Sequence, residues 1–228
     1  MAGIHRNRWP GSSVISGRDA PEYAIFRGNF SEMKRGEETE KKIIEAALHL
    51  FVRKGYHGTS ISEITEKVGL TKGALYSHFK SKGQLLLRII NEYESQYIDQ
   101  LIQVVSDHPG NARGKLHRAI SFSSSFAIKN LDLCLFLDYL TTELNADVDF
   151  LPALKRVYDK YQEFVSRVIQ EGIKEGLIKK ELDPALSALT FMAIHHGVLH
   201  QWVLNRYKLE GRDYVKTFRK ILMDGLKA

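Results

Sequence analysis

The chain has 228 residues, 43% hydrophobic and 26% charged, an ordinary globular composition that excludes wholesale disorder. The single cysteine, Cys134, excludes an internal disulfide, and the absence of a long apolar run or a signal-peptide core makes the cytoplasm the expected compartment. The formal net charge is +6, with +3 in residues 1–36, +2 in residues 37–82 and +1 in residues 83–228. This concentration of positive charge favours a nucleic-acid partner for the N-terminal part.

Residues 1–36 are rich in Gly, Ser, Arg and Asn, and no hydrophobic period runs through them. We expect a disordered tail there. Two alternatives stay open: translation that begins at Met33, and a basic arm that lies along DNA.

From Thr39 onward the hydrophobic pattern is helical, and no segment alternates as a strand does, so the expected fold class is all-α. Capping signals divide the helices: a capping box at Ser60, a terminal Gly69, a cap at Thr71 and a second capping box at Ser81. The expected helices are 39–54, 61–68, 72–79, 82–105, 112–129, 132–145, 151–175, 184–206 and 213–226.

The segment 59–85 has the spacing of a helix-turn-helix, in which the second helix enters the major groove and the first braces it. Leu75 and Phe79 are expected to anchor the second helix on the core. Its opposite face would present a set of small, polar and aromatic side chains to a partner: Thr71, Lys72, Gly73, Tyr76 and Ser77.

The run from Gly69 to Leu85 resembles the DNA-binding motif of the TetR family of transcriptional regulators. The segments 47–51 and 55–61 resemble the first helix and the following loop of the same family, so the resemblance covers about 50 residues strongly. It implies an N-terminal three-helix DNA-binding domain, residues 37–97, and a C-terminal helical ligand-binding and dimerisation domain, residues 98–228.

The resemblance also implies roles for single residues. Base contacts fall on Thr71, Lys72, Gly73 and Ala74, and mostly phosphate contacts on Thr59, Tyr76, His78 and Lys82, with Ser60 and Ser77 beside them. The structural alternative is that Tyr76 and His78 only pack the small domain, and that Lys82 is a solvated charge.

The C-terminal part contains no recognisable catalytic set, so we expect no enzyme activity and no cofactor. The resemblance implies a ligand pocket and a dimer interface between its helices. The residues expected in the pocket are aromatic: Phe122, Phe126, Phe136, Tyr139, Tyr161 and Phe191. The residues expected in the dimer interface are His195, Leu199, Trp202, Phe218 and Leu222.

Each of these assignments has a plainer alternative. The aromatic residues are as readily ordinary core, and Cys134 is expected to be a small buried hydrophobe rather than a redox sensor. His196 and His200 have the spacing of metal ligands, but no glutamate lies between them as in a protease motif, so no metal is expected.

The expected protein is therefore a homodimeric, ligand-responsive repressor on a near-palindromic operator, located at the nucleoid. Its effector would be a small lipophilic or aromatic molecule that shifts the helix 82–105. Two other hypotheses remain: a DNA-binding protein of this fold without an effector, which would lack a ligand-sized cavity, and an enzyme or transport-type binding protein with an incidental helix-turn-helix.

Overall fold

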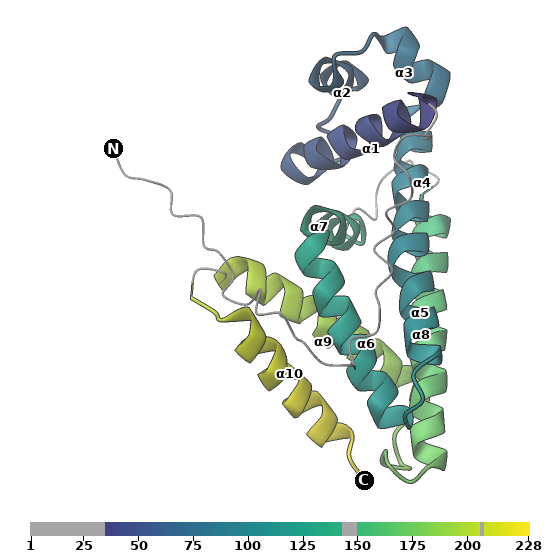
Figure 1. Ribbon diagram of the computed structural model, residues 1–228, viewed down its shortest axis with the longest axis vertical. Coiled ribbons are helices and arrows are strands. Elements are labelled where there is room, and N and C mark those ends of the chain that lie inside the picture. Colours follow the sequence, from purple (N-terminus) through teal and green to yellow (C-terminus); the bar gives the residue numbers. More distant parts are fainter. Residues whose placement is uncertain (1–34, 143–149, 206–207) are drawn as a thin grey trace, which may run out of the picture. The chain divides into compact units, whose positions relative to one another are not determined.

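The computed structural model describes residues 35–142, 150–205 and 208–228, and within these ranges the chain is helical (Figure 1). The expected tail 1–36, apart from its last two residues, and the ends of the expected helices 132–145 and 184–206 lie outside the described residues. Residues 39–228 form one compact unit. The elements are α1 (Arg35–Lys54), α2 (Ile61–Val68), α3 (Lys72–His78), α4 (Lys82–Tyr93), the π-helical η1 (Glu94–Asp99), α5 (Gln100–Ser106), α6 (Ala112–Lys129), α7 (Leu131–Leu140), α8 (Leu151–Lys174), α9 (Pro184–Asn205) and α10 (Gly211–Leu226).

Local capping explains where the first helices begin and end. α1 is followed by Gly55 in the left-handed conformation, with φ 75°, which residues other than glycine rarely adopt. The Ser60 hydroxyl accepts from the backbone N–H of Glu63, while the Glu63 carboxylate accepts from the Ser60 N–H, which is the predicted capping box. Gly69, with φ 69°, ends α2, and the Thr71 hydroxyl caps α3. The predicted caps at Ser60, Gly69 and Thr71 are confirmed. The second predicted capping box is only half formed: the Ser81 hydroxyl accepts from the Gln84 N–H, but the Gln84 side chain accepts from the N–H of Lys80 rather than from that of Ser81.

The first three helices share one apolar core with the start of α4. Ile43, Ala47 and Phe51 from α1 are buried against the same cluster as Ile64 of α2 and Leu75 of α3. Buried residues at these spacings fix the angle between α2 and α3, which contact each other directly. The core therefore holds α3 by its inner face only.

The prediction of one continuous helix over 82–105 was wrong in its middle. α4 gives way to the π-helical turn η1 before α5 resumes the α-helical pattern. A π-turn accommodates one extra residue compared with an α-helical turn. Here Tyr93, Tyr97 and Leu101 follow one another at intervals of four residues, and all three are buried. An unbroken α-helix would rotate the later residues of such a series progressively away from one face.

The remaining helices pack around η1 and α5. α8 runs beside α9, α6 lies against α5 and α8, and α10 covers part of α6 and α9. None of the described helices is by itself long and apolar enough to span a membrane; α6 and α7 pass a length-and-composition test only as a pair, and they meet at a bend of 102°.

One aromatic contact joins the first helices to the rest of the compact unit. The ring of Phe51 in α1 stacks on the ring of Phe136 in α7, with centroids 5.3 Å apart, and Tyr56 meets Phe51 edge-on. Phe136 is 1% exposed. α7 is therefore packed against the core of α1–α3 as well as against its own neighbours.

We predict that Phe136→Ala lowers the free energy of unfolding by about 3–5 kcal/mol, because it removes a fully buried ring and leaves a cavity between two packed helices. Chemical denaturation followed by circular dichroism measures this loss. The control is Tyr139→Ala on the same helix, where the side chain is 40% exposed, and its cost should be about 1 kcal/mol. Equal losses in the two variants would contradict the prediction.

Candidate nucleic-acid interface and internal cavities

The outer face of α3 is open to solvent. Lys72, Gly73, Tyr76 and Ser77 are exposed, whereas Leu75 on the opposite side is fully buried. Tyr76 is 48% exposed, which is unusual for so large a ring. α3 carries no acidic side chain, so this face combines one ammonium group, hydroxyl groups and a close-approach glycine.

The hydroxyls of Ser60 and Thr71 occupy the starts of α2 and α3. The Thr71 hydroxyl accepts from the backbone N–H of Ala74 at 3.1 Å, and both capping residues are exposed. Glu63 also pairs with Lys54 at the end of α1, and the Lys54 and Ser60 hydrogen bonds lower the pKa of its carboxyl to about 2. The cap of α2 is thereby tied to the end of α1.

Two residues expected to contact phosphates also make hydrogen bonds within the protein. The Thr59 side chain is 1% exposed, and its hydroxyl donates to the Gly55 carbonyl at 2.9 Å. The Lys82 ammonium donates to the carbonyls of Tyr56 and Thr59 at 2.9 Å each and lies 4.4 Å from the centre of the Tyr56 ring. Burial lowers the pKa of Lys82. These contacts fasten the loop before α2 to the first turn of α4. Two other residues expected at the DNA interface, Ala74 and His78 of α3, are half-buried.

Three adjoining cavities lie among the later helices. The first, here called the apolar cavity, has a volume of about 50 Å³ between α6, α9 and α10. The second, the mixed cavity, has about 20 Å³ and shares the lining residues Ala127, His195 and Leu199 with the first. The third, the tyrosine cavity, has no room for a water molecule and shares Tyr93 and His196 with the second. The shared residues place the three side by side, and each is smaller than a typical ligand pocket.

A separate cleft of about 280 Å³ lies between α5, α6 and α8. It is lined in part by Lys115, Arg167 and Glu171, and the Lys115 ammonium donates to the Glu171 carboxylate at 2.7 Å. It shares no lining residue with the three adjoining cavities.

The structure distributes the six expected pocket residues over several environments. Tyr161 lines the tyrosine cavity. Phe122 and Phe126 stand around the ring of Tyr97, with centroids 6.2 and 4.8 Å from it. Phe136 and Phe191 are buried in the core, and Tyr139 is partly exposed, with its hydroxyl beside Gly55.

Three of the five residues expected in a dimer interface line a cavity within this chain: His195 and Leu199 line both the apolar and mixed cavities, and Trp202 lines the apolar cavity. Phe218 and Leu222 lie on α10 and are buried.

The sequence analysis missed the large apolar residues that α9 exposes. Leu186 is 65% exposed and Leu204 75% exposed, and these residues are 18 positions apart, which places them on one helix face. Ala193 and Gly197 lie between them on that face and are also exposed. The signal was present in the sequence as an apolar helix with small residues every third or fourth position.

The mixed cavity contains a buried carboxylate. Asp138 in α7 is 8% exposed, and the imidazole Nε2 atoms of His196 and His200 lie 3.9 Å from its two oxygens, beyond hydrogen-bonding distance. Within the described residues, no group of three His, Cys, Asp or Glu side chains has a geometry that would hold a metal ion.

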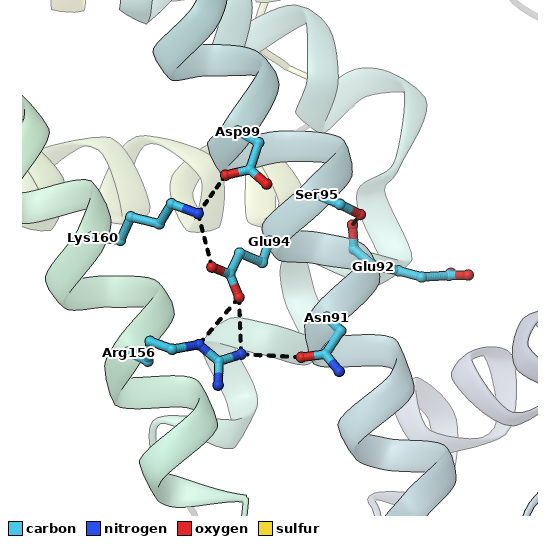
Figure 2. A network of polar contacts seen from close by, with 7 residues as sticks. All are labelled: Asn91, Glu92, Glu94, Ser95, Asp99, Arg156 and Lys160. Carbon is cyan, nitrogen blue, oxygen red and sulfur yellow. Dashed lines mark hydrogen bonds and ion pairs between the residues drawn. The ribbon is translucent and has the colours of Figure 1, made fainter.

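A network of ion pairs holds η1 against α8 (Figure 2). Lys160 donates to Glu94 at 2.9 Å and pairs with Asp99 at 2.5 Å, so one ammonium reaches both the first and last residue of the π-turn. Arg156 donates to Glu94 at 2.9 Å and to the side-chain oxygen of Asn91 at 3.1 Å. Burial acts to raise the pKa of Glu94, but the hydrogen bonds from Lys160 and Arg156 outweigh it and lower that pKa.

The opposite side of η1 borders the cavities. Tyr97 lines the mixed cavity and donates its hydroxyl proton to Ser123 of α6 at 2.7 Å, while Ile98 lines the tyrosine cavity. The π-turn therefore has an ionic outer side and a cavity-facing inner side, and α4 joins it directly to the helix-turn-helix.

A helix-turn-helix with an exposed second helix, joined by one helical path to a larger helical bundle, is the arrangement of a DNA-binding transcriptional regulator. Comparison with known families agrees. Residues 43–89 match the sequence profile described as "Bacterial regulatory proteins, tetR family", and residues 90–225 match "YsiA-like protein, C-terminal region". The chain belongs to the TetR family, and its relatives are transcriptional regulators.

Solved structures of similar fold support the same assignment. The MbdR regulator from Azoarcus sp. CIB is 28% identical, with a TM-score of 0.75, over 82% of this chain and 98% of its own. FadR from Bacillus subtilis, solved with stearoyl-CoA, is 23% identical, with a TM-score of 0.70, over 82% and 98%. AibR, solved with isovaleryl coenzyme A and operator DNA, is 22% identical, with a TM-score of 0.70, over 81% and 97%.

We predict that Glu94→Gln lowers stability at neutral pH by about 1 kcal/mol, or about 2–4 °C in Tm, because Lys160 and Arg156 lose their shared anion. The pKa of Glu94 is lower in the folded protein than its ordinary value of about 4.3. Its stabilisation is therefore present above that value and is lost as the pH falls through the folded-state pKa.

Thermal unfolding of the two proteins across a pH series measures this effect. The difference in Tm should shrink on acidification, and Glu163→Gln, an exposed glutamate of α8, should show almost none at any pH. If the difference in Tm between the original protein and Glu94→Gln is as large at acidic pH as at neutral pH, the ion pairs of Glu94 are not its cause.

Proposed function

We propose that this regulator is a ligand-responsive repressor that acts as a homodimer on a near-palindromic operator. Residues 37–97 would form the DNA-binding domain, and residues 98–228 the effector-binding and dimerisation domain. The observation that carries the proposal is the open face of α3, where Tyr76 is 48% exposed and Lys72 is exposed while the inner face is buried. A protein that bound DNA would act at the nucleoid, in the cytoplasm.

The DNA contacts are proposed from exposure. Lys72, at the start of α3, reaches guanine edges or phosphates, and Gly73 lets the helix start approach the groove. Tyr76 and Ser77 lie on the same open face, and Ser60, Thr71, Ala74 and His78 border it. Thr59 and Lys82 support this surface from within, because their polar groups already bind Gly55, Tyr56 and Thr59.

The homodimer is proposed from the exposed apolar face of α9. Leu186 and Leu204 would be costly to leave in water over so long a helix face, and the small residues Ala193 and Gly197 between them allow a partner helix to come close. Ile221 of α10, 69% exposed, extends the same kind of surface to the last helix. Two copies joined by such faces would present two α3 helices to one operator.

The effector is proposed to enter the adjoining cavities. Their lining is mostly apolar and aromatic, which favours a lipophilic or aromatic molecule. FadR was solved with stearoyl-CoA and AibR with isovaleryl coenzyme A, so a ligand with an apolar part is consistent with other proteins of this fold.

Coupling to DNA is proposed to run through η1. A ligand against Tyr97 or Tyr93 would displace the π-turn and with it α4, changing the separation of the two α3 helices. A coupling of about 1–3 kcal/mol would weaken operator binding roughly 5–150-fold. The effector-free alternative stays open, because the adjoining cavities are smaller than a ligand.

The first test concerns the exposed face of α3. We expect Lys72→Ala to weaken binding to an operator duplex, selected from a random library, by about tenfold or more, because a base or phosphate contact is lost. Fluorescence anisotropy across a salt series measures affinity and salt slope. Lys180→Ala removes an exposed lysine beyond α8 and should leave both unchanged. Equal effects of the two variants would remove α3 from the interface.

The second test concerns the apolar face of α9. We expect the double variant Leu186→Glu with Leu204→Glu to be monomeric in analytical ultracentrifugation and to lose tight operator binding, because four buried carboxylates would face each other in the dimer. The matched control, Leu186→Met with Leu204→Met, keeps the apolar surface and should stay dimeric. A glutamate variant that remains a folded dimer would place the interface elsewhere.

A further inference from the structure

Two histidines of α9 flank one buried carboxylate of α7. The Nε2 atom of His196 lies 3.9 Å from one oxygen of Asp138, and the Nε2 atom of His200 lies 3.9 Å from the other. The two histidines are four residues apart, so they lie on the same face of α9. The Tyr158 hydroxyl of α8 is hydrogen-bonded to the same carboxylate. Asp138, His196 and His200 are here called the carboxylate–histidine cluster.

The two gaps in the cluster correspond to neutral imidazole rings beside an anion. A distance of 3.9 Å is too long for a hydrogen bond, whereas a protonated imidazole and a carboxylate approach each other to about 2.7–2.9 Å. A proton on either ring would create an ion pair across its gap. Closing that gap would draw α9 toward α7.

Among the described residues, the other titratable groups that face the cluster stay neutral between roughly pH 5 and pH 8. Burial raises the pKa of Cys134, on α7, to about 12, and lowers that of His195, on α9, to about 3. Burial also raises the pKa of three tyrosines from other elements: Tyr93 of α4, Tyr97 of η1 and Tyr158 of α8. No lysine, arginine or second acidic residue of the described chain lines the mixed or tyrosine cavity. A change of charge in this pH range therefore falls on the cluster itself.

Burial and charge act against each other within the cluster. Burial lowers the pKa of His196, and the Asp138 charge raises it in part, so this ring takes up a proton below the ordinary pH of about 6.5. Burial raises the pKa of Asp138, and the two histidines lower it in part. The side chain of His200 is 54% exposed and that of Asp138 7%, so the cluster meets solvent at His200 and is closed at the carboxylate.

We propose that the carboxylate–histidine cluster is a proton-binding site that makes this regulator respond to acidification. A proton taken up by either imidazole pairs that ring with Asp138 and fastens α9 to α7. The effect on DNA rests on the proposed function. The adjoining cavities are smaller than a ligand, whereas a proton needs no cavity.

The two helices that the proton would join lead to the DNA-binding core and to the proposed dimer interface. Asp138 lies two residues after Phe136, whose ring stacks on Phe51 of α1. α9 carries the exposed apolar face with Leu186 and Leu204. A change in the contact between α7 and α9 would therefore alter how the core of α1–α3 is held relative to the dimer face, and with it the operator affinity.

Nuclear magnetic resonance of the full chain, with isotope-labelled histidine, tests proton binding. The imidazole signals of His196 and His200 are identified by their loss in His196→Gln and His200→Gln. We expect both to titrate between about pH 5 and about pH 7, and Asp138→Asn to move the His196 midpoint to lower pH by about one unit or more, because the anion that favours the imidazolium is gone. Asp132→Asn, the same exchange at an exposed position of α7, should leave the midpoint unchanged. A His196 midpoint that Asp138→Asn does not lower overturns the inference.

Operator affinity at about pH 7.5 and about pH 5.5, measured by fluorescence anisotropy, tests regulation. The ratio of the two dissociation constants should differ by about fivefold or more between the original protein and the double variant His196→Gln with His200→Gln. The histidines of the DNA-binding domain are the same in both proteins, so their protonation cancels in this comparison. His108→Gln, outside the cluster, should keep the original ratio. Equal ratios in the original protein and the double variant overturn the inference, and this comparison stands even if Asp138→Asn fails to fold.

Failure of the proposed function is distinguishable, because the imidazole titration needs no DNA. If the two histidines titrate with Asp138 as expected in a protein that binds no duplex selectively at either pH, the proposed repressor is contradicted and the proton-binding site is not. Selective operator binding together with a His196 midpoint that ignores Asp138→Asn would do the reverse.

Discussion

The structure depends on one helical path that is buried in a single apolar core along its length. Leu85, Leu86 and Ile89 of α4 are buried near its start, and Tyr97 and Leu101 are buried further along, in the same core as residues of α1–α3, α6 and α8. Because buried side chains at both ends fix the rotation of the path, neither end can turn freely. A displacement of η1 would therefore move α4 rather than be absorbed by a flexible linker.

The π-turn in this path is held by two kinds of force that differ in strength and range. On its outer side, the ion pairs of Glu94 and Asp99 with Lys160 are partly exposed, and pairs of this kind contribute only about 0–1 kcal/mol each. On its inner side, Tyr97 is 4% exposed and lies among several rings. The rings fix the position of the π-turn. The ion pairs on its outer side are weak, so they could break and re-form while the protein stays folded.

What the sequence could predict follows from the range of the interactions involved. The caps at Ser60, Gly69 and Thr71 are set by neighbours three or four residues away, so their predictions held. The π-turn lies among rings from distant parts of the chain, since Tyr97 contacts Phe122, Phe126 and Tyr161, and no local pattern encodes those contacts. The helix 184–205 is apolar on nearly all sides, so periodicity could not tell which side meets the cavity and which meets solvent. The residue contacts expected at the DNA-binding face, the pocket and the interface stay predictions.

Cys134 gives the cavity an intrinsic chemical probe. The thiol lines the mixed cavity beside Asp138, and burial raises its pKa to about 12, so it is protonated and sluggish in the closed protein. It is also the only cysteine in the chain, which makes any alkylation by a neutral thiol reagent report on a single site. The rate of that alkylation depends on how often the helical bundle opens, and a bound ligand would lower it. Opening of the cavity can therefore be followed over time without DNA or an added label.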